Sequence, residues 1–321
     1  MKNRDKKRKK SRLKRFLIFL LILVVVLFGG CFLIVDKLYG QINYQMASDY
    51  VDEPWKSDGV INILLIGNDS RENGEDGRSD AMILLSISDR SKTVHMTSIL
   101  RDIYVDIPGH DPNRLNAAYA FGGPELLMET VEQNFDIDVN RYVLVNFEAF
   151  ANLVDSVDGV ELELSSQEIE YVNAYLVEYN MLTQRPEGTD YMDASQSGQV
   201  HLNGAQALAY SRNRYIGTDF GRTQRQRNVL SAVLEKLPRA LLSNPKMLMD
   251  GILPNLTTNL TRNECFGLSL QAGKFLLYDI EQGSIPLEGT YHDANIRGMS
   301  VLEVDFEENK AYLQKNIYNI K

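Results

Sequence analysis

The sequence predicts an α/β domain with a central mixed β-sheet flanked by helices, preceded by one transmembrane helix. Three observations support this prediction. Short runs rich in aliphatic and β-branched residues end at Gly, Asp, Arg or Ser, as strands do. Residues 142–164 alternate strand, helix and strand patterns, which is typical of an α/β fold. Close to the N-terminus, residues 16–35 form an apolar run without a charge.

The first 35 residues divide into a basic tail and this apolar run. Residues 1–15 hold ten Lys and Arg against a single Asp. As a helix, twenty residues would reach roughly 30 Å, which spans a bilayer core. Because basic flanks stay in the cytoplasm, we expect a single-pass cell-membrane protein with its C-terminal domain extracellular. A cleaved signal peptide, or lipoprotein processing at Cys31, is the alternative.

The remainder of the chain is acidic, with 24 Lys and Arg against 42 Asp and Glu after the basic tail is removed. So acidic a surface binds phosphate backbones poorly, and we expect no nucleic-acid partner. The only cysteines are Cys31 and Cys265, which predicts an external domain without an internal disulfide. Residues 36–58 are polar and without a period, which predicts a stalk, and residues 59–321 are expected to form one extracellular domain.

The elements of this domain follow in order. Three strands are predicted first, at residues 60–67, 81–88 and 93–100. Residues 116–135 predict a helix in which Pro124 can occupy a first turn.

The strand–helix–strand pattern at 142–164 comes next. Residues 165–200 are polar and poorly patterned, which predicts an insertion over the surface, and residues 201–214 resume helical spacing. A helix from Gly221 is predicted by the spacing of Val229, Leu230, Val233, Leu234 and Leu237. A strand and a helix close the chain.

Five arginines and no lysine occur in the stretch YSRNRYIGTDFGRTQRQRN. On a helix, Arg222, Arg225 and Gln226 project to the same side as the apolar stripe, which would direct them inward. They would lie at the helix N-terminus, whose free N–H groups attract anions. Arg212 and Arg214 share a face if their stretch is extended. Arginine favours two-point recognition of phosphate or carboxylate. The alternative is surface ion pairs with the domain's many acids.

Two carboxylates flank the turn between the first two predicted strands. If these strands form a hairpin, Asp69 and Asp80 lie at the same sheet edge and could hold Mg²⁺. Ordinary turn chemistry is the alternative for both. Arg78 could add a cation there, or it is a solvated loop arginine. Arg101 follows the third strand, where a local ion pair with Asp102 is the alternative to a binding role.

Taken in order, these segments resemble the LytR–CpsA–Psr family of bacterial cell-envelope proteins. The resemblance covers residues 60–230 and, more loosely, the C-terminal tail. Two positions depart from the family's usual pattern: Leu100 replaces Pro, and Asp158 replaces Gly, and neither removes a charged residue. The segments that carry the resemblance are ILLIGNDSR, RSDAMILLSI, SILRDIYVDIP, RLNAAYAFGG, YVLVNFEAFANLVDSVDGV, LNGAQALAYSRNR and DFGRTQRQ.

The resemblance implies a three-layer catalytic domain behind a short cytoplasmic tail and a single anchor. It implies a Mg²⁺- or Mn²⁺-dependent phosphotransferase that moves a glycan-1-phosphate from polyprenyl pyrophosphate to the C6 hydroxyl of a peptidoglycan sugar. The glycan would be wall teichoic acid, capsule or a similar polymer. By the same resemblance, Asp69 and Asp80 hold the metal, and Asp219 orders the arginine loop. The pyrophosphate would be bound by Arg78, Arg101, Arg212, Arg214, Arg222 and Gln226.

Catalysis would then depend on Asp80, Arg222 and Asp219, with Asp80 or Asp219 as the base for the sugar hydroxyl. The lipid tail requires a long apolar slot between sheet and helices, with its mouth toward the membrane. We expect residues 143–147 and the helix at 221–237 to line this slot. Two alternatives remain: a polyprenyl-pyrophosphate hydrolase, and a non-catalytic lipid-carrier-binding or regulatory protein of envelope assembly.

Overall fold

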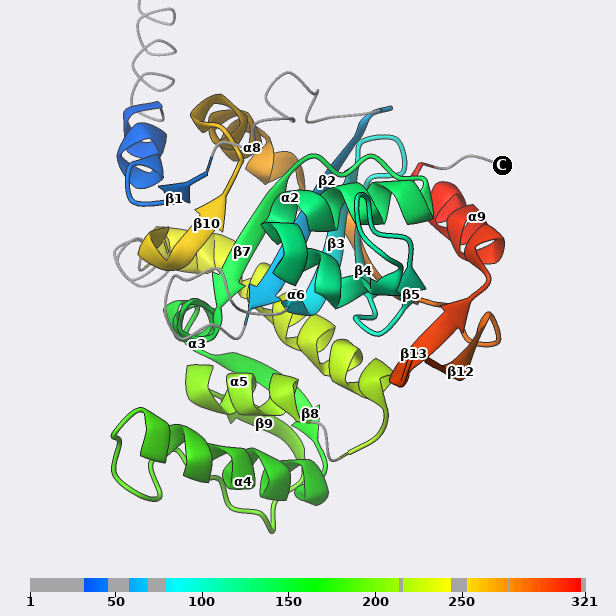
Figure 1. The fold of residues 1–321 in the computed structure, drawn as a ribbon. Coiled ribbons are helices and arrows are strands. Elements are labelled where there is room, and N and C mark those ends of the chain that lie inside the picture. Colours follow the sequence, from blue (N-terminus) through cyan, green and yellow to red (C-terminus); the bar gives the residue numbers. More distant parts are fainter. Residues whose placement is uncertain are drawn as a thin grey trace, which may run out of the picture.

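A mixed sheet forms the centre of the protein, seen in a computed structural model that describes residues 32–45, 58–68, 79–213, 216–243, 253–275 and 277–318. Within these residues the sheet has seven strands in the order β1-β10-β7-β2-β3-β4-β11 (Figure 1). The hairpin expected between the first two long strands is confirmed, because β2 and β3 pair antiparallel. The strands are β1 Asn43–Tyr44, β2 Val60–Asn68, β3 Ser79–Ser88, β4 Thr93–Ile99, β7 Tyr142–Asn146, β10 Leu256–Thr258 and β11 Asp279–Ile285.

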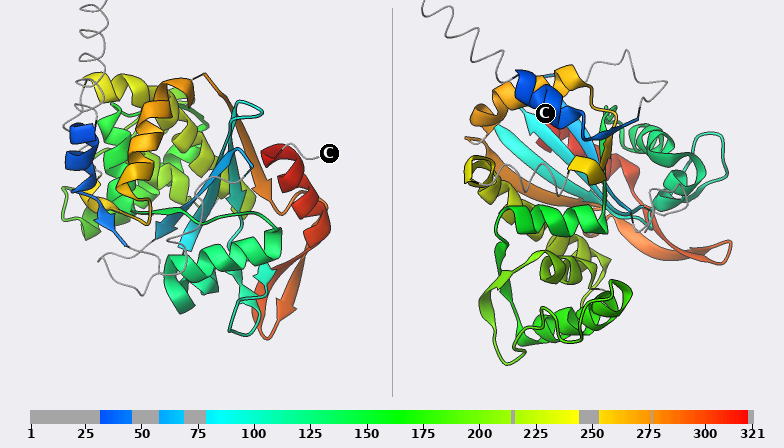
Figure 2. Two further views of the ribbon diagram at one scale, coloured as in Figure 1. Left: turned by 90° about the horizontal axis from the view of Figure 1, so that it is seen from above. Right: turned by 90° about the vertical axis from the view of Figure 1, so that its left-hand side faces the viewer.

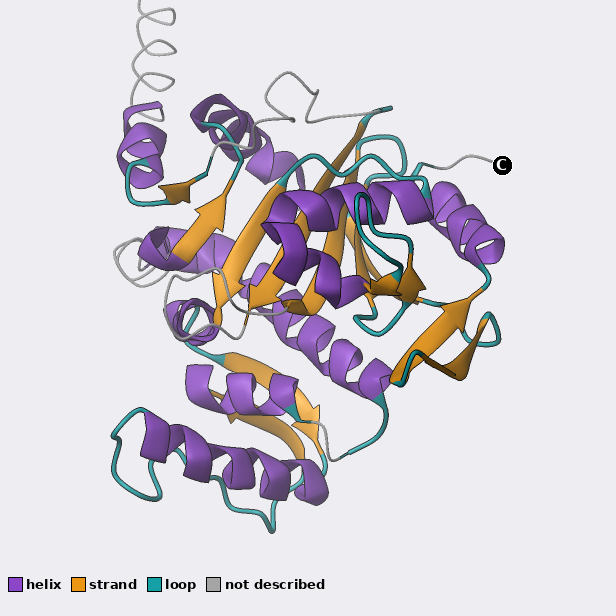
Figure 3. Cartoon of the chain, viewed as in Figure 1, coloured by secondary structure: helices purple, strands orange, loops and turns teal. Residues whose placement is uncertain are grey.

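Helices cover both faces of this sheet, which confirms the expected three layers (Figures 2 and 3). Side chains alternate along β2, so Val60, Leu64 and Ile66 join one core while Ile61 and Ile63 join another. The first core packs against α2 Leu115–Phe135 and α9 Phe306–Ile317. The opposite face packs against α3 Phe147–Ser156, α6 Asp219–Ser243 and α8 Arg262–Phe275.

The helix predicted at 116–135 is confirmed with a break. Gly122 and Gly123 depart from helical φ and ψ, and Pro124 begins the segment that follows. The remaining short elements are β5 Tyr104–Val105, β6 Asn113–Arg114, β12 Tyr291–Ile296, β13 Met299–Val304 and the 3-10 turn η1 Leu253–Asn255.

The surface insertion predicted for residues 165–200 is wrong. A 17-residue helix, α4 Ser166–Leu182, begins there with a capping box between Ser165 and Glu168. Its side chains Ile169, Val172 and Leu176 are fully buried, three and four positions apart. They share a core with β8 Val160–Leu164, β9 Gly198–Leu202, α5 Gly204–Arg212 and α6. This layer lies at the lower end of the molecule in Figure 1.

The described part of the N-terminal segment is folded against the domain. Residues 32–39 form a helix, and β1 pairs parallel with β10 in the main sheet. Residues 36–45 are therefore packed against the domain and do not form part of the stalk predicted for residues 36–58. In the part of the chain that the structure describes, no helix is long and apolar enough to cross a membrane. The predicted basic tail and all but the last four residues of the predicted span lie outside the described residues, so both stay predictions.

Gly204 fixes how closely α5 approaches α3, and α5 ends at Arg212. A Cβ atom at Gly204 would lie 2.2 Å from the carbonyl oxygen of Ala151. We therefore expect Gly204→Ala to lower the free energy of unfolding by about 1–3 kcal/mol or more, because overpacking forces the helices apart. Denaturant unfolding of the purified protein measures this change.

Gly273 in α8 is the matched control. It has nothing within 4 Å of a built Cβ and no positive φ, so Gly273→Ala is expected to raise stability by roughly 0.5–1 kcal/mol. Equal effects of the two substitutions would contradict the close approach of α5 to α3.

Candidate functional site

A cavity of about 140 Å³ lies between the central sheet and helices α3, α5 and α6. Its walls are mostly apolar, and residues 145–147 and α6 contribute to them, as expected for residues 143–147 and the helix at 221–237. The charged and amide side chains in its wall are Asp80, Asn146, Arg212, Arg222 and Gln226. The large apolar ones are Leu65, Ile66, Ile83, Val145, Phe147, Phe150, Leu153, Leu208 and Leu230.

The cavity is polar at one end and apolar along its length. On α6, Arg222, Gln226 and Leu230 are spaced by four residues and form one wall that changes from charged to apolar. On β3, Asp80 stands near the start of the strand and Ile83 further along it, in the same order. The arrangement suits a molecule with an anionic head and an apolar tail.

Small residues open the sheet side of this cavity. Gly67 pairs with Ala81 across the β2–β3 hairpin, and both line the cavity. A Cβ at Gly67 would lie 3.0 Å from the Cβ of Ala81, so the space depends on glycine at this position. Two residues further along the hairpin, Leu65 pairs with Ile83. The larger side chains of this pair form the apolar floor of the cavity.

Strand register brings Asp80 to Arg101. Because Ile83 pairs with Ser98 in the antiparallel β3–β4 ladder, Asp80 falls opposite Arg101, just beyond the end of β4. Arg101 Nη1 donates to Asp80 Oδ1 at 2.6 Å, and its Nε donates to Asp102 Oδ2 at 3.3 Å. The local ion pair with Asp102 is thus present, and the link to Asp80 is added to it.

Arg101 stays charged in this setting. Burial works against its charge, but Asp102 and Asp80 together hold the pKa of the guanidinium above its ordinary value. Arg114, a residue that no sequence pattern singles out, donates from Nη1 to Asp102 Oδ1 at 3.4 Å. Arg114 is the last residue of the two-residue strand β6. The pairing of β6 with β5 brings it close to Asp102, which the sequence alone does not indicate.

The first turn of α6 carries Arg222 inward, as the helical spacing predicted. Its side chain is 4% exposed, and Nη2 lies 2.9 Å from Oδ1 of Asp219, whose side chain is 45% exposed. Asp219 is thus ion-paired with Arg222, and its predicted role in ordering the arginine loop stays a prediction. Arg222 and Arg225 are both buried, so neither is a surface arginine, although Arg222 does pair with an acid, Asp219.

Arg212 and Arg225 have different surroundings. Arg212 is the last residue of α5, not part of an extended stretch, and its guanidinium lies 3.7 Å from the ring centroid of Phe147 in the cavity wall. Arg225 points away from the cavity: its Nη2 donates to the carbonyl oxygens of Asn213 at 2.7 Å and Ile216 at 3.1 Å. Arg225 therefore fastens the chain between α5 and α6.

Three predicted site residues, Asp69, Arg78 and Arg214, lie outside the described residues and stay predictions. The residues on either side of the first two are described. Asn68 pairs with Ser79 at the mouth of the hairpin, next to Asp80. Within the described ranges no cluster of three or more His, Cys, Asp or Glu side chains could hold a metal ion.

The fold and the cavity define a class of protein, an α/β domain with a mostly apolar cavity whose charged end is built from arginines and a carboxylate. More particularly, the chain belongs to the LytR_cpsA_psr family, whose model matches residues 34–316.

Curated relatives cover most of the chain. It is 32% identical over 97% of its length to the whole of TagU of Enterococcus faecalis, named a polyisoprenyl-teichoic acid–peptidoglycan teichoic acid transferase. It is 34% identical to TagT of Bacillus subtilis, which has the same activity name, over 80% of this chain and 77% of TagT. The regulatory protein MsrR of Staphylococcus aureus is 30% identical over 81% of this chain and 75% of MsrR.

A solved structure of the family protein YwtF (TagT), with bound octaprenyl pyrophosphate lipid, matches the fold with a TM-score of 0.61. The two sequences are 29% identical, and the match covers 85% of this chain and 96% of that chain.

Two buried arginines of α6 outside the cavity make a matched pair. Arg225 bonds two backbone carbonyls, whereas Arg227 has Gln224 Oε1 as its acceptor at 2.6 Å, and burial lowers the pKa of Arg227 to about 10. We expect Arg225→Met to cost about 2 kcal/mol of stability, because two buried acceptors lose their donor. Arg227→Met is expected to be neutral or to stabilise by about 1 kcal/mol, because it removes a poorly compensated buried charge.

Thermal unfolding of the two variants beside the parent protein measures both effects. Equal loss of stability in the two variants would show that Arg227 is as well compensated as Arg225.

Proposed function

We propose that the protein is a membrane-anchored, extracytoplasmic phosphotransferase of glycopolymer attachment. It moves a glycan-1-phosphate from polyprenyl pyrophosphate to the C6 hydroxyl of a peptidoglycan sugar. The observation that supports this most is the slot itself, apolar along its length and edged by Arg212, Arg222 and Asp80. Relatives named teichoic acid transferases, and the family structure with a polyprenyl pyrophosphate, support the same class of donor.

The donor fits the slot in one direction. Its isoprenoid tail would lie along Leu65, Ile83 and Leu230, where burial of apolar surface contributes about 25 cal/mol per Å². Its pyrophosphate would then meet Arg222 and Arg212, with Gln226 beside them. Guanidinium groups bind phosphate oxygens by two parallel hydrogen bonds, more strongly in a water-poor site. Arg78, Arg101 and Arg214 are proposed to complete this group of pyrophosphate ligands.

The reaction transfers the glycan-bearing phosphoryl group. The C6 oxygen of the acceptor attacks the phosphorus next to the glycan, and the bond from that phosphorus to the bridging oxygen breaks. Polyprenyl monophosphate leaves as an anion and needs no proton. Negative charge grows on the bridging and equatorial oxygens, which is the charge that Arg222 and its neighbours stabilise.

The acceptor hydroxyl loses a proton, and a carboxylate of the site is proposed to accept it. Asp80 has one oxygen committed to Arg101. Asp219 is bonded to Arg222 and is largely open to solvent, on the side from which a polymer can approach. Both carboxylates stay candidates for this role.

A divalent cation fits the proposed site as a partner of the bound donor. Mg²⁺ is usually held by one or two carboxylates, with phosphate oxygens and water completing its shell. Asp80 supplies one carboxylate in the cavity wall, and Asp69 is proposed to supply the second. Mg²⁺ or Mn²⁺ held there would neutralise pyrophosphate charge.

A second candidate function is a non-catalytic lipid-carrier-binding or regulatory role. The relative MsrR, which is named a regulatory protein, favours it. The same slot would serve this role without an acceptor, so only a transfer measurement separates the two functions.

Loss of the charged end should abolish transfer while the fold survives. We expect Arg222→Ala and Asp80→Asn each to slow transfer at least about 100-fold, because each removes a group that stabilises transition-state charge. The full chain in lipid vesicles is given a synthetic polyprenyl-pyrophosphate glycan, peptidoglycan oligomers and Mg²⁺, and the acceptor mass is followed.

The control is Arg90→Ala, an exposed arginine 3.9 Å from Asp58, which should leave transfer unchanged. Release of glycan phosphate without acceptor gain would replace the transferase by the hydrolase. An intact donor that stays bound to the wild-type protein would leave the binding role.

The apolar wall should set the preference for tail length. Leu230 lies two helical turns from Arg222, so Leu230→Trp is expected to shorten the slot. The KM for a long polyprenyl donor should rise about tenfold, a loss of roughly 1.4 kcal/mol, while a two-isoprene donor is unaffected. Val177→Trp, on the exposed face of α4, is the control. An equal rise for both donors would mean that the tail lies elsewhere.

A further inference from the structure

The helix at residues 32–39 is fastened to α8. The rings of Phe32 and Phe266 meet edge to face with centroids 5.4 Å apart. One turn further along the first helix and one turn back along α8, Asp36 Oδ1 lies 2.7 Å from Arg262 Nη1. The two contacts have opposite chain order, so the helix at residues 32–39 and α8 run antiparallel where they touch.

The next residues extend this attachment into the main sheet. Tyr39 donates its hydroxyl to the carbonyl oxygen of Leu260 at 2.9 Å. Asn43 pairs with Thr257 in the β1–β10 ladder, and Asn43 Nδ2 donates to Thr257 Oγ1 at 3.2 Å. The last apolar residue, Val35, is therefore followed at once by residues held on the domain, with no free linker between them.

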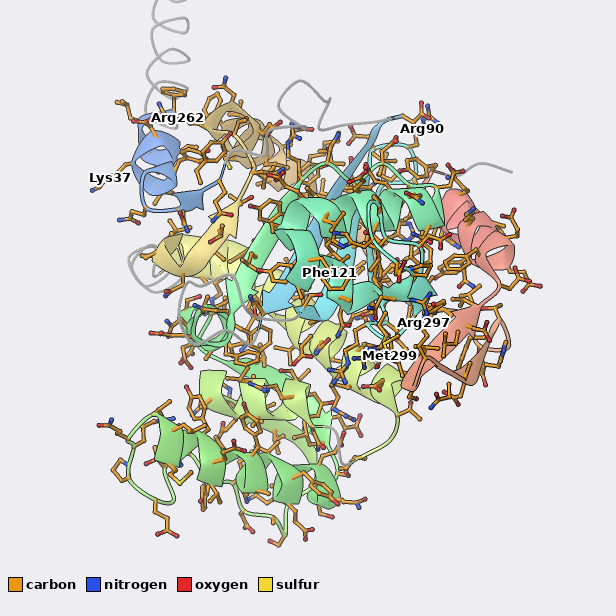
Figure 4. All side chains as sticks on the ribbon, viewed as in Figure 1. Lys37, Arg90, Phe121, Arg262, Arg297 and Met299 are labelled. Atoms are coloured by element: carbon orange, nitrogen blue, oxygen red, sulfur yellow. The ribbon has the colours of Figure 1, made fainter. Side chains whose placement is uncertain are left out.

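The exposed surface of α8 differs from the rest of this acidic chain. Among residues 262–275 the only acid is Glu264, which is buried and bonded to Arg141. Leu270 is exposed, and Leu277 in the following turn is 83% exposed. Figure 4 shows Lys37 and Arg262 at this same end of the molecule. We call this surface, made of residues 32–37, the outer side of α8 and Leu277, the α8 surface.

The helix at the opposite end of the molecule is more acidic, although it also exposes the apolar side chains Val177, Met181 and Leu182. The helix at 32–39 and α8 lie at one end, and α4, with three glutamates in its sequence, lies at the other (Figures 1 and 2).

On the α8 surface Leu270 and Leu277 are exposed, and the cations Arg262 and Lys274 are paired with Asp36 and Asp89. Exposed leucines beside partly exposed cations suit a bilayer interface.

We infer that the α8 surface rests on the outer leaflet of the membrane, so that the anchor holds the domain in one orientation. This inference rests on the membrane anchoring in the proposed function. It gives the slot a direction. Along β2, the charged end lies at Gly67, Leu65 follows, and Ile63 and Ile61 are already covered by the core under α8. The tail therefore runs from the arginines toward the membrane side.

The test places a fluorophore at two ends of the full chain in vesicles containing anionic lipid. Bimane is attached to Leu277→Cys or, as the matched control, to Met181→Cys, which is 71% exposed on α4. Cys31 and Cys265 are first replaced by Ala, so that the introduced cysteine carries the only thiol of the chain. Quenching by spin-labelled lipid is compared with quenching by aqueous iodide.

Lipid quenching at position 277 several-fold stronger than at 181 is the expected result. Protein that floats with the vesicles but whose position 277 is quenched only by iodide would overturn the docking and leave the anchor and the transferase intact. Protein that does not float would overturn the anchor, and with it the docking, whereas the proposed transfer reaction is judged separately by acceptor mass.

Leu277→Glu gives a second readout, and its exposed position makes misfolding a minor concern. It should lower transfer from vesicle-borne donor several-fold and leave transfer from detergent micelles unchanged. Met181→Glu should change neither rate. Equal rates for Leu277→Glu and the parent protein in vesicles would contradict the inference.

Discussion

The burial of Arg222 beside an apolar slot is the constraint on which the rest of the site depends. A guanidinium withdrawn from water loses hydration that one carboxylate seldom restores in full. The first turn of a helix adds to the cost, because the positive end of the helix dipole repels a cation. Asp219, three residues earlier and bonded to Arg222, offsets part of both costs. In the proposed function, pyrophosphate bound beside Arg222 and Arg212 would add to this compensation, and its binding would then stabilise this corner of the fold.

Sheet geometry decides where that anion can lie. The β2–β3 hairpin sets Gly67 against Ala81 and thereby leaves room above the strands. The β3–β4 ladder places Arg101 opposite Asp80, so the carboxylate nearest the slot is held by a cation from the neighbouring strand. A slip of one residue in either ladder would turn these side chains to the other face. The charged end of the slot thus depends on a register that the buried aliphatic residues of the strands enforce.

Strong periodicity made much of this visible in the sequence. The three central strands follow from short β-rich runs that end at Gly, Asp, Arg or Ser, and α6 follows from the stripe through Val229 and Val233, which also places Arg222 inward. The pattern of α4 is hard to see because exposed apolar side chains, Val177 and Met181, lie beside its buried stripe of Ile169, Val172 and Leu176 and blur the helical period. A two-residue strand such as β1 has no period at all, so the folded segment at 36–45 was predicted as a stalk. Spacing also cannot separate Arg222 from Arg225, since only the carbonyls of Asn213 and Ile216 draw Arg225 away from the slot.

In the proposed reaction, the polymeric acceptor must reach a phosphorus that the membrane-bound donor carries. The donor and the acceptor therefore need separate paths into the site. The change along α6 from Arg222 to Leu230 gives the donor a path that is apolar toward the side covered by α8. The side chain of Asp219 is far more exposed than that of the arginine it bonds, at 45% against 4% for Arg222. The acceptor can therefore meet a carboxylate in water while the phosphates remain among buried cations. Because Asp219 is not part of the cavity wall, a donor tail that fills the cavity would leave this carboxylate open to the acceptor.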